Sequence, residues 1–218
     1  MDKFQHRYRI ASARAPWHDY NGGVYFITIC TAHRNHYFGE IQNAEMCMNE
    51  LGQMAYENLQ HLTNHYPYAS IDVFQIMPNH IHLIVCIDEP MGNDGTIGRC
   101  NIERNVVERD IIPNVVVRDD CRDVARRVST GKTGETGETG ITPESDKMRD
   151  IANKRGLLSV AIGGFKSAIT KYANKNKIPF GWQARFHDHI IRDVGEYERI
   201  ALYIENNPKT WEKDKLNE

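Results

Sequence analysis

The chain has 218 residues, of which 40% are hydrophobic, and its formal net charge is −2 at pH 7. This length allows one large domain, or a smaller one with insertions. The negative charge argues against a simple electrostatic nucleic-acid binder, although a local basic patch could still grip nucleic acid. No apolar run approaches the ~20 residues of a membrane span, and the polar start lacks a signal region, so we expect a cytoplasmic protein without a membrane partner. Five scattered cysteines predict reduced thiols.

The first 20 residues place three arginines among aromatic residues. Arg7, Arg9 and Arg14 are interleaved with Tyr8 and Trp17. This mixture suits phosphate pairing and base stacking on a nucleic-acid strand. It equally suits an arm whose aromatic side chains pack on the core, and both interpretations stay open.

The remaining chain alternates strand-like and helix-like patterns. Apolar and β-branched runs predict strands at 24–31, 70–77, 80–88 and 182–192. Amphipathic spacing predicts helices at 49–66, from 157 up to Pro179, and at 195–206. The first strand is apolar on both faces, which is typical of a central strand. Pro78 and Asn79 form a turn, so the strands beside them should pair as a hairpin.

Residues 89–156 differ from the rest in composition. They contain no aromatic residue, and 131–140 repeat Gly, Glu and Thr. Such a segment cannot bury enough apolar surface to offset chain entropy. We therefore expect one domain over 1–218, interrupted by a flexible insertion at 89–156. Without the insertion, the order matches the split βαβ plan. This predicts an α+β, ferredoxin-like antiparallel sheet with helices on one face and an additional C-terminal helix.

Two histidines, His80 and His82, stand one residue apart at the start of the 80–88 strand. Alternate residues of a strand share a face, and these two would lie roughly 7 Å apart. Two neutral imidazoles on one face can hold a divalent metal. The alternative is that each imidazole is only packed in the core or bonded to solvent.

The last predicted helix offers Tyr203, with Asn207 four residues later and therefore on the same face. A tyrosine hydroxyl, with a pKa near 10, is a weak nucleophile at neutral pH unless a metal assists it. Asn207 could give its amide oxygen to the same ion. Alternatively, Tyr203 packs as a core residue beside Ile200 and Ile204.

The motifs carry a family resemblance. The run MPNHIHLIV at 77–85 resembles the HUH motif (His, hydrophobic, His) of the single-tyrosine transposases. The stretches WQARFHDHIIR at 182–192 and YIENNP at 203–208 are similar to the REP-associated tyrosine transposases. The resemblance covers roughly 15–88 and 157–211, so the domain is identified as an HUH transposase-like catalytic domain.

This resemblance implies a metal-dependent endonuclease and strand transferase. His80, His82 and Asn207 would hold Mg²⁺ or Mn²⁺, and Tyr203 would attack a DNA phosphodiester. The products would be a 5′-phosphotyrosine and a free 3′-OH, which conserve the bond energy for rejoining. The implied partner is single-stranded or hairpin DNA, and a homodimer is left open.

Other residues receive weaker assignments. Tyr197 is a rival nucleophile, but it lies about 240° around the helix from Tyr203, so both cannot face the metal. His187 and His189 share a strand face and are candidates for a supporting role behind the ligands. Candidate DNA contacts are Arg7, Arg9, Arg14, Lys166, Lys171 and Arg185.

Two further hypotheses come from other functional classes. The same fold could serve as a non-cleaving regulator that binds hairpin DNA. It could also be a ferredoxin-like module that binds a metal or ligand without any role in nucleic-acid chemistry.

Overall fold

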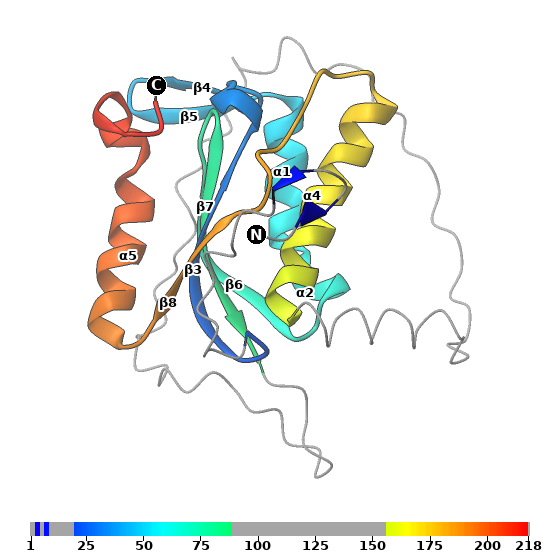
Figure 1. Ribbon diagram of the computed structural model, residues 1–218. Coiled ribbons are helices and arrows are strands. Elements are labelled where there is room, and N and C mark those ends of the chain that lie inside the picture. Colours follow the sequence, from blue (N-terminus) through cyan, green and yellow to red (C-terminus); the bar gives the residue numbers. More distant parts are fainter. Residues whose placement is uncertain (1–2, 5–6, 9–19, 89–155, 218) are drawn as a thin grey trace.

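The computed structural model describes residues 3–4, 7–8, 20–88 and 156–217 (Figure 1). Its centre is a four-stranded antiparallel sheet in the order β6-β7-β3-β8. These strands are β3 (Gly23–Cys30), β6 (Ala69–Ile76), β7 (His80–Ile87) and β8 (His187–Ile191). Helix α1 (Glu50–Gln60) lies between β3 and β6 in the chain, and α4 (Leu157–Lys175) precedes β8. The predicted ferredoxin-like α+β fold is therefore confirmed, with β3 as a central strand.

The helices form layers on both faces of the sheet. Helices α1 and α4 cover one face, and α5 (Val194–Asn206) lies on the other (Figure 1). Because side chains alternate along a strand, β3 and β7 each serve both faces. Their residues that join the core beneath α1 and α4 are Tyr25, Ile27, Ile29, Ile81, Leu83, Val85 and Ile87. Their residues that join a smaller cluster beneath α5 are Val24, Phe26, Ile84 and Cys86.

The helix predicted at 49–66 is divided in two. Asn49 caps α1, because its side chain accepts a hydrogen bond from Gly52 N at 3.0 Å. Helix α1 ends at His61, whose φ of −105° and ψ of 14° leave the helical region. A short helix α2 (Leu62–His65) follows and buries Leu62.

A hairpin of β4 (Gly39–Gln42) and β5 (Glu45–Met48) was not predicted. Its two loop residues, Asn43 and Ala44, have φ values of 52° and 62°. Two consecutive left-handed residues are the geometry of a type I′ turn, which sequence usually signals by Asn-Gly. Alanine in the second position hides that signal.

The 182–192 strand is shorter than predicted. Only His187–Ile191 pairs continuously with β3, while Trp182 makes an isolated bridge to Thr31. Arg185 has a φ of 71°, which takes the chain out of extended geometry between them.

Short elements complete the described chain. They are β1 (Lys3–Phe4), β2 (Arg7–Tyr8) and the 3₁₀ turns η1 (Ala32–Arg34) and η3 (Pro208–Lys213). The chain continues past Pro208 because proline is tolerated in the first turn of a helix. In the described ranges, no helix combines the length and apolarity needed to cross a membrane.

Two further predictions concern the insertion and the cysteines. Apart from Gly156, the predicted insertion at 89–156 lies outside the described residues, so the prediction of one interrupted domain stays a prediction. Cys86 at the end of β7 is disulfide-bonded, whereas Cys30 and Cys47 are free. The expectation of reduced thiols is therefore wrong for Cys86.

Candidate metal and tyrosine site

Strand β7 places His80 and His82 on the sheet face that α5 covers. The ring centroids lie 4.5 Å apart, and the side chains are almost fully buried, at 0% and 3% exposure. In register, Cys30 of β3 lies opposite His80, and Thr28 lies opposite His82. The shared face that strand geometry predicts for the pair is therefore present.

Neighbouring side chains hold both imidazoles by their Nδ1 atoms. His80 Nδ1 lies 2.8 Å from Asn79 Oδ1, and the Asn79 amide nitrogen donates to Leu216 O at 2.6 Å, which fixes that carboxamide's orientation. His82 Nδ1 lies 2.9 Å from Thr28 Oγ1. A hydrogen bond at Nδ1 orients the ring and leaves Nε2 to face a ligand.

Two buried atoms of the site lack a hydrogen-bond partner among the described residues: His80 Nε2 and Asn207 Oδ1. Such unsatisfied groups are costly and rare in native structures, so each asks for an explanation. A carboxylate is near, since Asp214 Oδ2 lies 3.9 Å from His80 Nε2 and accepts from Asn207 Nδ2 at 3.1 Å. His80, His82 and Asp214 offer ligand atoms within 4.8 Å of one another, so they could hold a metal ion.

The electrostatics of the site favour neutral imidazoles. Burial lowers the pKa of His80 to about 3. Burial also lowers the pKa of His82 to about 3, and the adjacent His80 ring adds to the effect. Both rings are therefore uncharged at pH 7, which is the form that binds a metal.

Helix α5 brings Tyr203 to this pair. The helix packs through Ile204, which is fully buried beneath it. The Tyr203 hydroxyl lies 3.3 Å from His82 Nε2, and its ring meets Phe26 edge-on at 6.2 Å between centroids. Tyr203 is 45% exposed, so it is not the core residue of the alternative interpretation and stays open to a ligand.

The environment of Tyr203 disfavours the phenolate. Burial raises the pKa of its hydroxyl, the Asp214 carboxylate raises it further, and the Asn207 side chain opposes the rise. A positive charge beside the hydroxyl would reverse this balance. The protein alone therefore keeps Tyr203 a protonated, weak nucleophile.

The rival Tyr197 belongs to a different part of α5. Its hydroxyl donates to Asp72 Oδ2 on β6 at 3.4 Å, and burial raises its pKa. It packs in the apolar cluster beneath the helix. The structure thus places Tyr203, and not Tyr197, against the histidine pair.

Asp214 is the residue of the site that the sequence motifs did not indicate. It follows η3, where buried Trp211 packs against the His80 ring at 6.0 Å between centroids. This turn brings the chain back over the site after α5 ends. The one available signal was weak: an aromatic residue and an acid shortly after Pro208.

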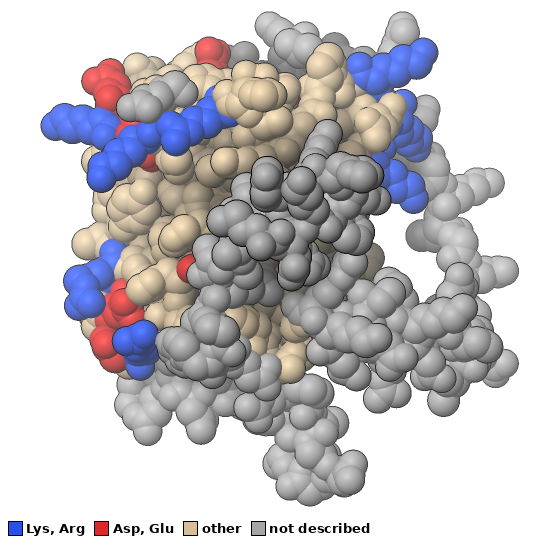
Figure 2. All heavy atoms as spheres, in the orientation of Figure 1, with Lys and Arg blue, Asp and Glu red and all other residues tan. Residues whose placement is uncertain are grey.

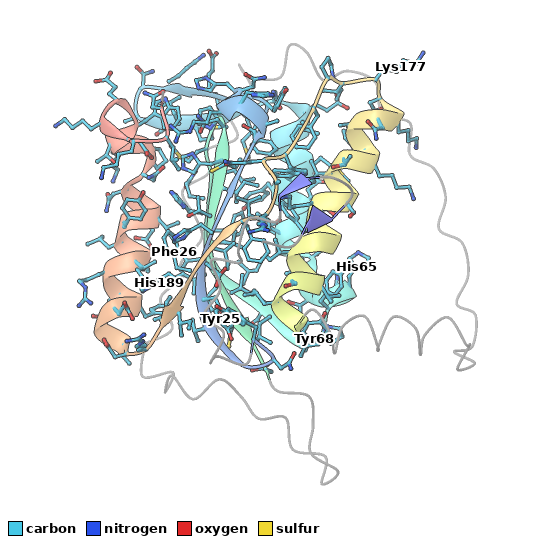
Figure 3. All side chains as sticks on the ribbon, viewed as in Figure 1. Tyr25, Phe26, His65, Tyr68, Lys177 and His189 are labelled. Carbon is cyan, nitrogen blue, oxygen red and sulfur yellow. The ribbon has the colours of Figure 1, made fainter. Side chains whose placement is uncertain are left out.

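The second histidine pair lies beside the site. His187 and His189 are exposed on β8, opposite Thr28 and Phe26 of β3. His189 Nε2 lies 2.8 Å from Oε1 of Glu196 in the first turn of α5. Figure 3 shows Phe26 and His189 between the sheet and this helix. Their supporting role stays a prediction.

Two of the basic candidates, Lys166 and Lys171, lie on α4, across the sheet from the face that carries the histidines. The Lys166 ammonium group on α4 donates hydrogen bonds to Gln183 O at 2.9 Å and to Arg185 O at 2.8 Å. These bonds hold the segment before β8 in place. Of the N-terminal arginines, Arg9 and Arg14 lie outside the described residues, as does the side chain of Arg7.

A comparison with known proteins shows the family of this chain. A Haemophilus influenzae (strain ATCC 51907 / DSM 11121 / KW20 / Rd) protein, described as uncharacterized, is 30% identical over 195 residues, which cover 89% of this chain and 84% of that protein. The chain belongs to the family of this Haemophilus protein. No family model matches it.

Two solved structures are similar to this member of the Haemophilus protein's family. One is a REP-associated tyrosine transposase bound to a REP hairpin, with 16% identity, a TM-score of 0.46, and coverage of 94% of this chain and 77% of that chain. The other is a protein from Deinococcus radiodurans R1 described as a transposase candidate, with 11% identity, a TM-score of 0.32, and coverage of 90% and 97%.

Proposed function

We propose that this protein is a metal-dependent endonuclease and strand transferase that acts on single-stranded DNA beside hairpins. One observation carries the proposal: the Tyr203 hydroxyl lies 3.3 Å from His82 Nε2, beside two buried atoms, His80 Nε2 and Asn207 Oδ1, that form no hydrogen bond within the described chain. An oriented hydroxyl next to a converging set of ligand atoms is the arrangement that a metal-assisted nucleophile needs.

The donor set fits a small divalent cation. His80 and His82 would contribute Nε2, and oxygen would come from the Asn207 amide and the Asp214 carboxylate. Oxygen donors of this kind suit Mg²⁺ and Mn²⁺. When bound, such an ion would polarise the phosphate and favour the ionised hydroxyl, which supplies what the raised pKa of Tyr203 lacks.

The residues of the chain then have defined tasks. Tyr203 Oη forms a bond to phosphorus while the bond from phosphorus to the 3′-oxygen breaks. In balance, the phenolic proton ends on the departing 3′-oxygen. The products are a 5′-phosphotyrosine and a free 3′-OH, and attack by another 3′-OH reverses the step and rejoins a strand. The partly exposed position of Tyr203 gives DNA access to the hydroxyl.

The sequence motifs favour hairpin-flanked DNA as the substrate. This is also the kind of DNA bound in the solved REP-associated tyrosine transposase. The inverted repeat nearest to the gene in its genome is therefore the first hairpin to test.

A covalent-adduct assay tests the chemistry. Wild-type protein, incubated with Mn²⁺ and a hairpin labelled 3′ of the candidate cleavage sites, should give a labelled adduct that survives denaturing electrophoresis. Tyr203→Phe should give none, since the nucleophile is gone. Tyr197→Phe is the matched control on the same helix and should keep the adduct. An adduct formed by Tyr203→Phe would refute the proposed nucleophile.

The adduct assay, together with hairpin binding measured at rising salt, distinguishes the proposed enzyme from the two alternative functions. The non-cleaving regulator predicts hairpin binding without Mn²⁺, no adduct from wild-type protein, and equal affinity for wild type and Tyr203→Phe. A module without a nucleic-acid role would retain no hairpin at any salt concentration, whereas phosphate contacts weaken steeply as salt rises.

A further inference from the structure

A cleft opens at the end of the sheet where β3 ends. It has a volume of about 540 Å³ and lies between η1 and the segment before β8; its lining is Thr31, Ala32, His33, Arg34, Trp182, Gln183 and Ala184. This volume falls within the range of small-ligand sites, roughly 300–1,000 Å³. None of these residues takes part in the tyrosine chemistry above.

The backbone on both sides of this cleft is fixed. Gln183 N donates to Cys30 O at 2.9 Å, and Ala32 N donates to Gly181 O at 2.8 Å. Trp182 Nε1 donates to Lys166 O at 3.1 Å. The cleft is therefore formed before any ligand arrives.

Left-handed residues cluster at this cleft. His33 and Arg34 both have a φ of 55°, and Arg185 just beyond the opposite wall has a φ of 71°. Such conformations cost energy in residues other than glycine and concentrate at binding and catalytic sites. They turn the backbone of both walls sharply around the hollow.

The lining has the chemistry of a nucleotide site. Gln183 is exposed and presents a carboxamide, which can both donate to and accept from a base edge. Ala32 and Ala184 leave room for a flat ring. The rings of Phe38, Phe165 and Phe180 pack around Trp182, so its indole forms a wall and is not a free stacking surface.

Positive charge lies at the rim. Arg34 donates from Nη1 to Lys215 O at 2.9 Å, which holds its guanidinium beside the cleft. Lysine and arginine side chains gather at this end of the molecule, over the C-terminal end of α4 and over η3 (Figure 2). Those in the described chain include Lys175, Lys177, Lys209 and Lys213. Acidic residues of β4 and η3, Glu40 and Glu212, lie at the same end, so the basic character is local to Arg34 and these lysines.

The cleft is joined directly to the histidine pair. Thr31 on its wall donates from Oγ1 to Asn79 O at 2.9 Å, and Asn79 in turn orients the His80 ring. The cleft wall and the His80 ring therefore share Asn79 as a hydrogen-bonded neighbour.

We propose that this cleft binds one unpaired nucleotide of the DNA strand, with the base against Gln183 and the phosphate toward Arg34. This inference rests on the proposed function, because it assigns part of the same DNA to a separate site. It makes Gln183 a specificity residue that acts away from the reacting phosphate.

Selection from a pool of DNA hairpins with randomised single-stranded flanks tests the cleft. The parent protein carries Tyr203→Phe, so that binding is measured without cleavage. Adding Gln183→Ala should abolish the base preference at one flank position, leave the others intact, and weaken affinity for the parent's consensus roughly ten-fold. Gln183→Glu should shift that preference toward cytosine, whose amino group can donate to a carboxylate.

Controls separate recognition from folding and from the proposed chemistry. Gln60→Ala, an exposed glutamine on α1, should enrich the parent's consensus, and Gln183→Ala should melt with the parent. If Gln183→Ala enriches the same consensus with the same affinity, the cleft holds no base. If the parent enriches no hairpin, the inference and the DNA substrate fail together. If it enriches hairpins but wild type forms no adduct, only the chemistry fails.

Discussion

Among the described residues, 24 buried apolar residues form one continuous core with α1 and α4, whereas six belong to the cluster between the sheet and α5. The α5 side instead carries buried imidazoles, a buried amide and the half-exposed Tyr203. Adjacent residues of β7 belong to opposite sides: Leu83 enters the core, and His82 enters the site. The same strand therefore stabilises the fold with one face and positions reactive groups with the other.

The largest expected effect concerns two neighbouring residues of β7 whose side chains lie on opposite faces of the sheet. Leu83→Ala should lower the free energy of unfolding by about 3 kcal/mol, since it leaves a cavity in the dense core. His82→Ala should cost less than half of that, because burying a polar imidazole stabilises the fold less than burying an apolar side chain does. Urea unfolding in EDTA measures both, with unchanged m values. Equal losses would contradict the division of labour between the faces.

Metal binding should add stability through the α5 side alone. At a Mn²⁺ concentration of 100 times Kd, wild type should gain about 2.7 kcal/mol, seen as a rise in melting temperature. His80→Ala and Asp214→Asn should lose most of this gain, since each removes a proposed ligand. His65→Ala, an exposed histidine on α2, is the control and should respond like wild type. An undiminished response of His80→Ala would place the ion elsewhere.

Acid should weaken the metal-free protein through the same two histidines. Their pKa is about 3 in the folded state, against an ordinary 6.5. Between these values the unfolded chain binds more protons, so stability is complete above pH 6.5 and falls as the pH drops toward 3. From pH 6.5 to 4.5 we expect a loss of roughly 2 kcal/mol for each of the two histidines. His80→Gln with His82→Gln should flatten this slope in EDTA, and parallel slopes would count against it.

Sequence patterns predicted most of the fold, because strands, helices and tight turns depend on residues that are close together in the chain. The apolar, β-branched runs of β3 and β7, the amphipathic helices and the Pro78-Asn79 turn each follow from nearby residues. The β4–β5 hairpin escaped because its turn uses Ala44 at a left-handed position. Strand β8 is shorter than predicted because Arg185 leaves extended geometry, which its side chain does not announce.

Only part of the site could be predicted from the sequence, because local patterns do not determine how elements far apart in the chain pack together. His80 and His82 share a strand face by spacing alone, and Tyr203 and Asn207 share a helix face. That these faces meet depends on how α5 packs across the sheet, which no local pattern encodes. Asp214 was missed because it arrives through η3, a turn held by the burial of Trp211 against the His80 ring.

The smallest expected effect compares the N-terminal caps of two helices that cover opposite faces of the sheet. Asn49 caps α1 and Asp193 caps α5, each by a side-chain oxygen that accepts from a backbone N–H. Changing either residue to alanine should cost about 1 kcal/mol.

Hydrogen exchange should distinguish the two variants, since local opening is easiest where few apolar contacts must break. Asp193→Ala should speed exchange in α5 while β7 stays protected, because the cluster beneath α5 is small. Asn49→Ala should speed α1 and β7 together, because both belong to the large core. If Asp193→Ala also exposed β7, α5 would be an integral part of the core and not a helix laid over the site.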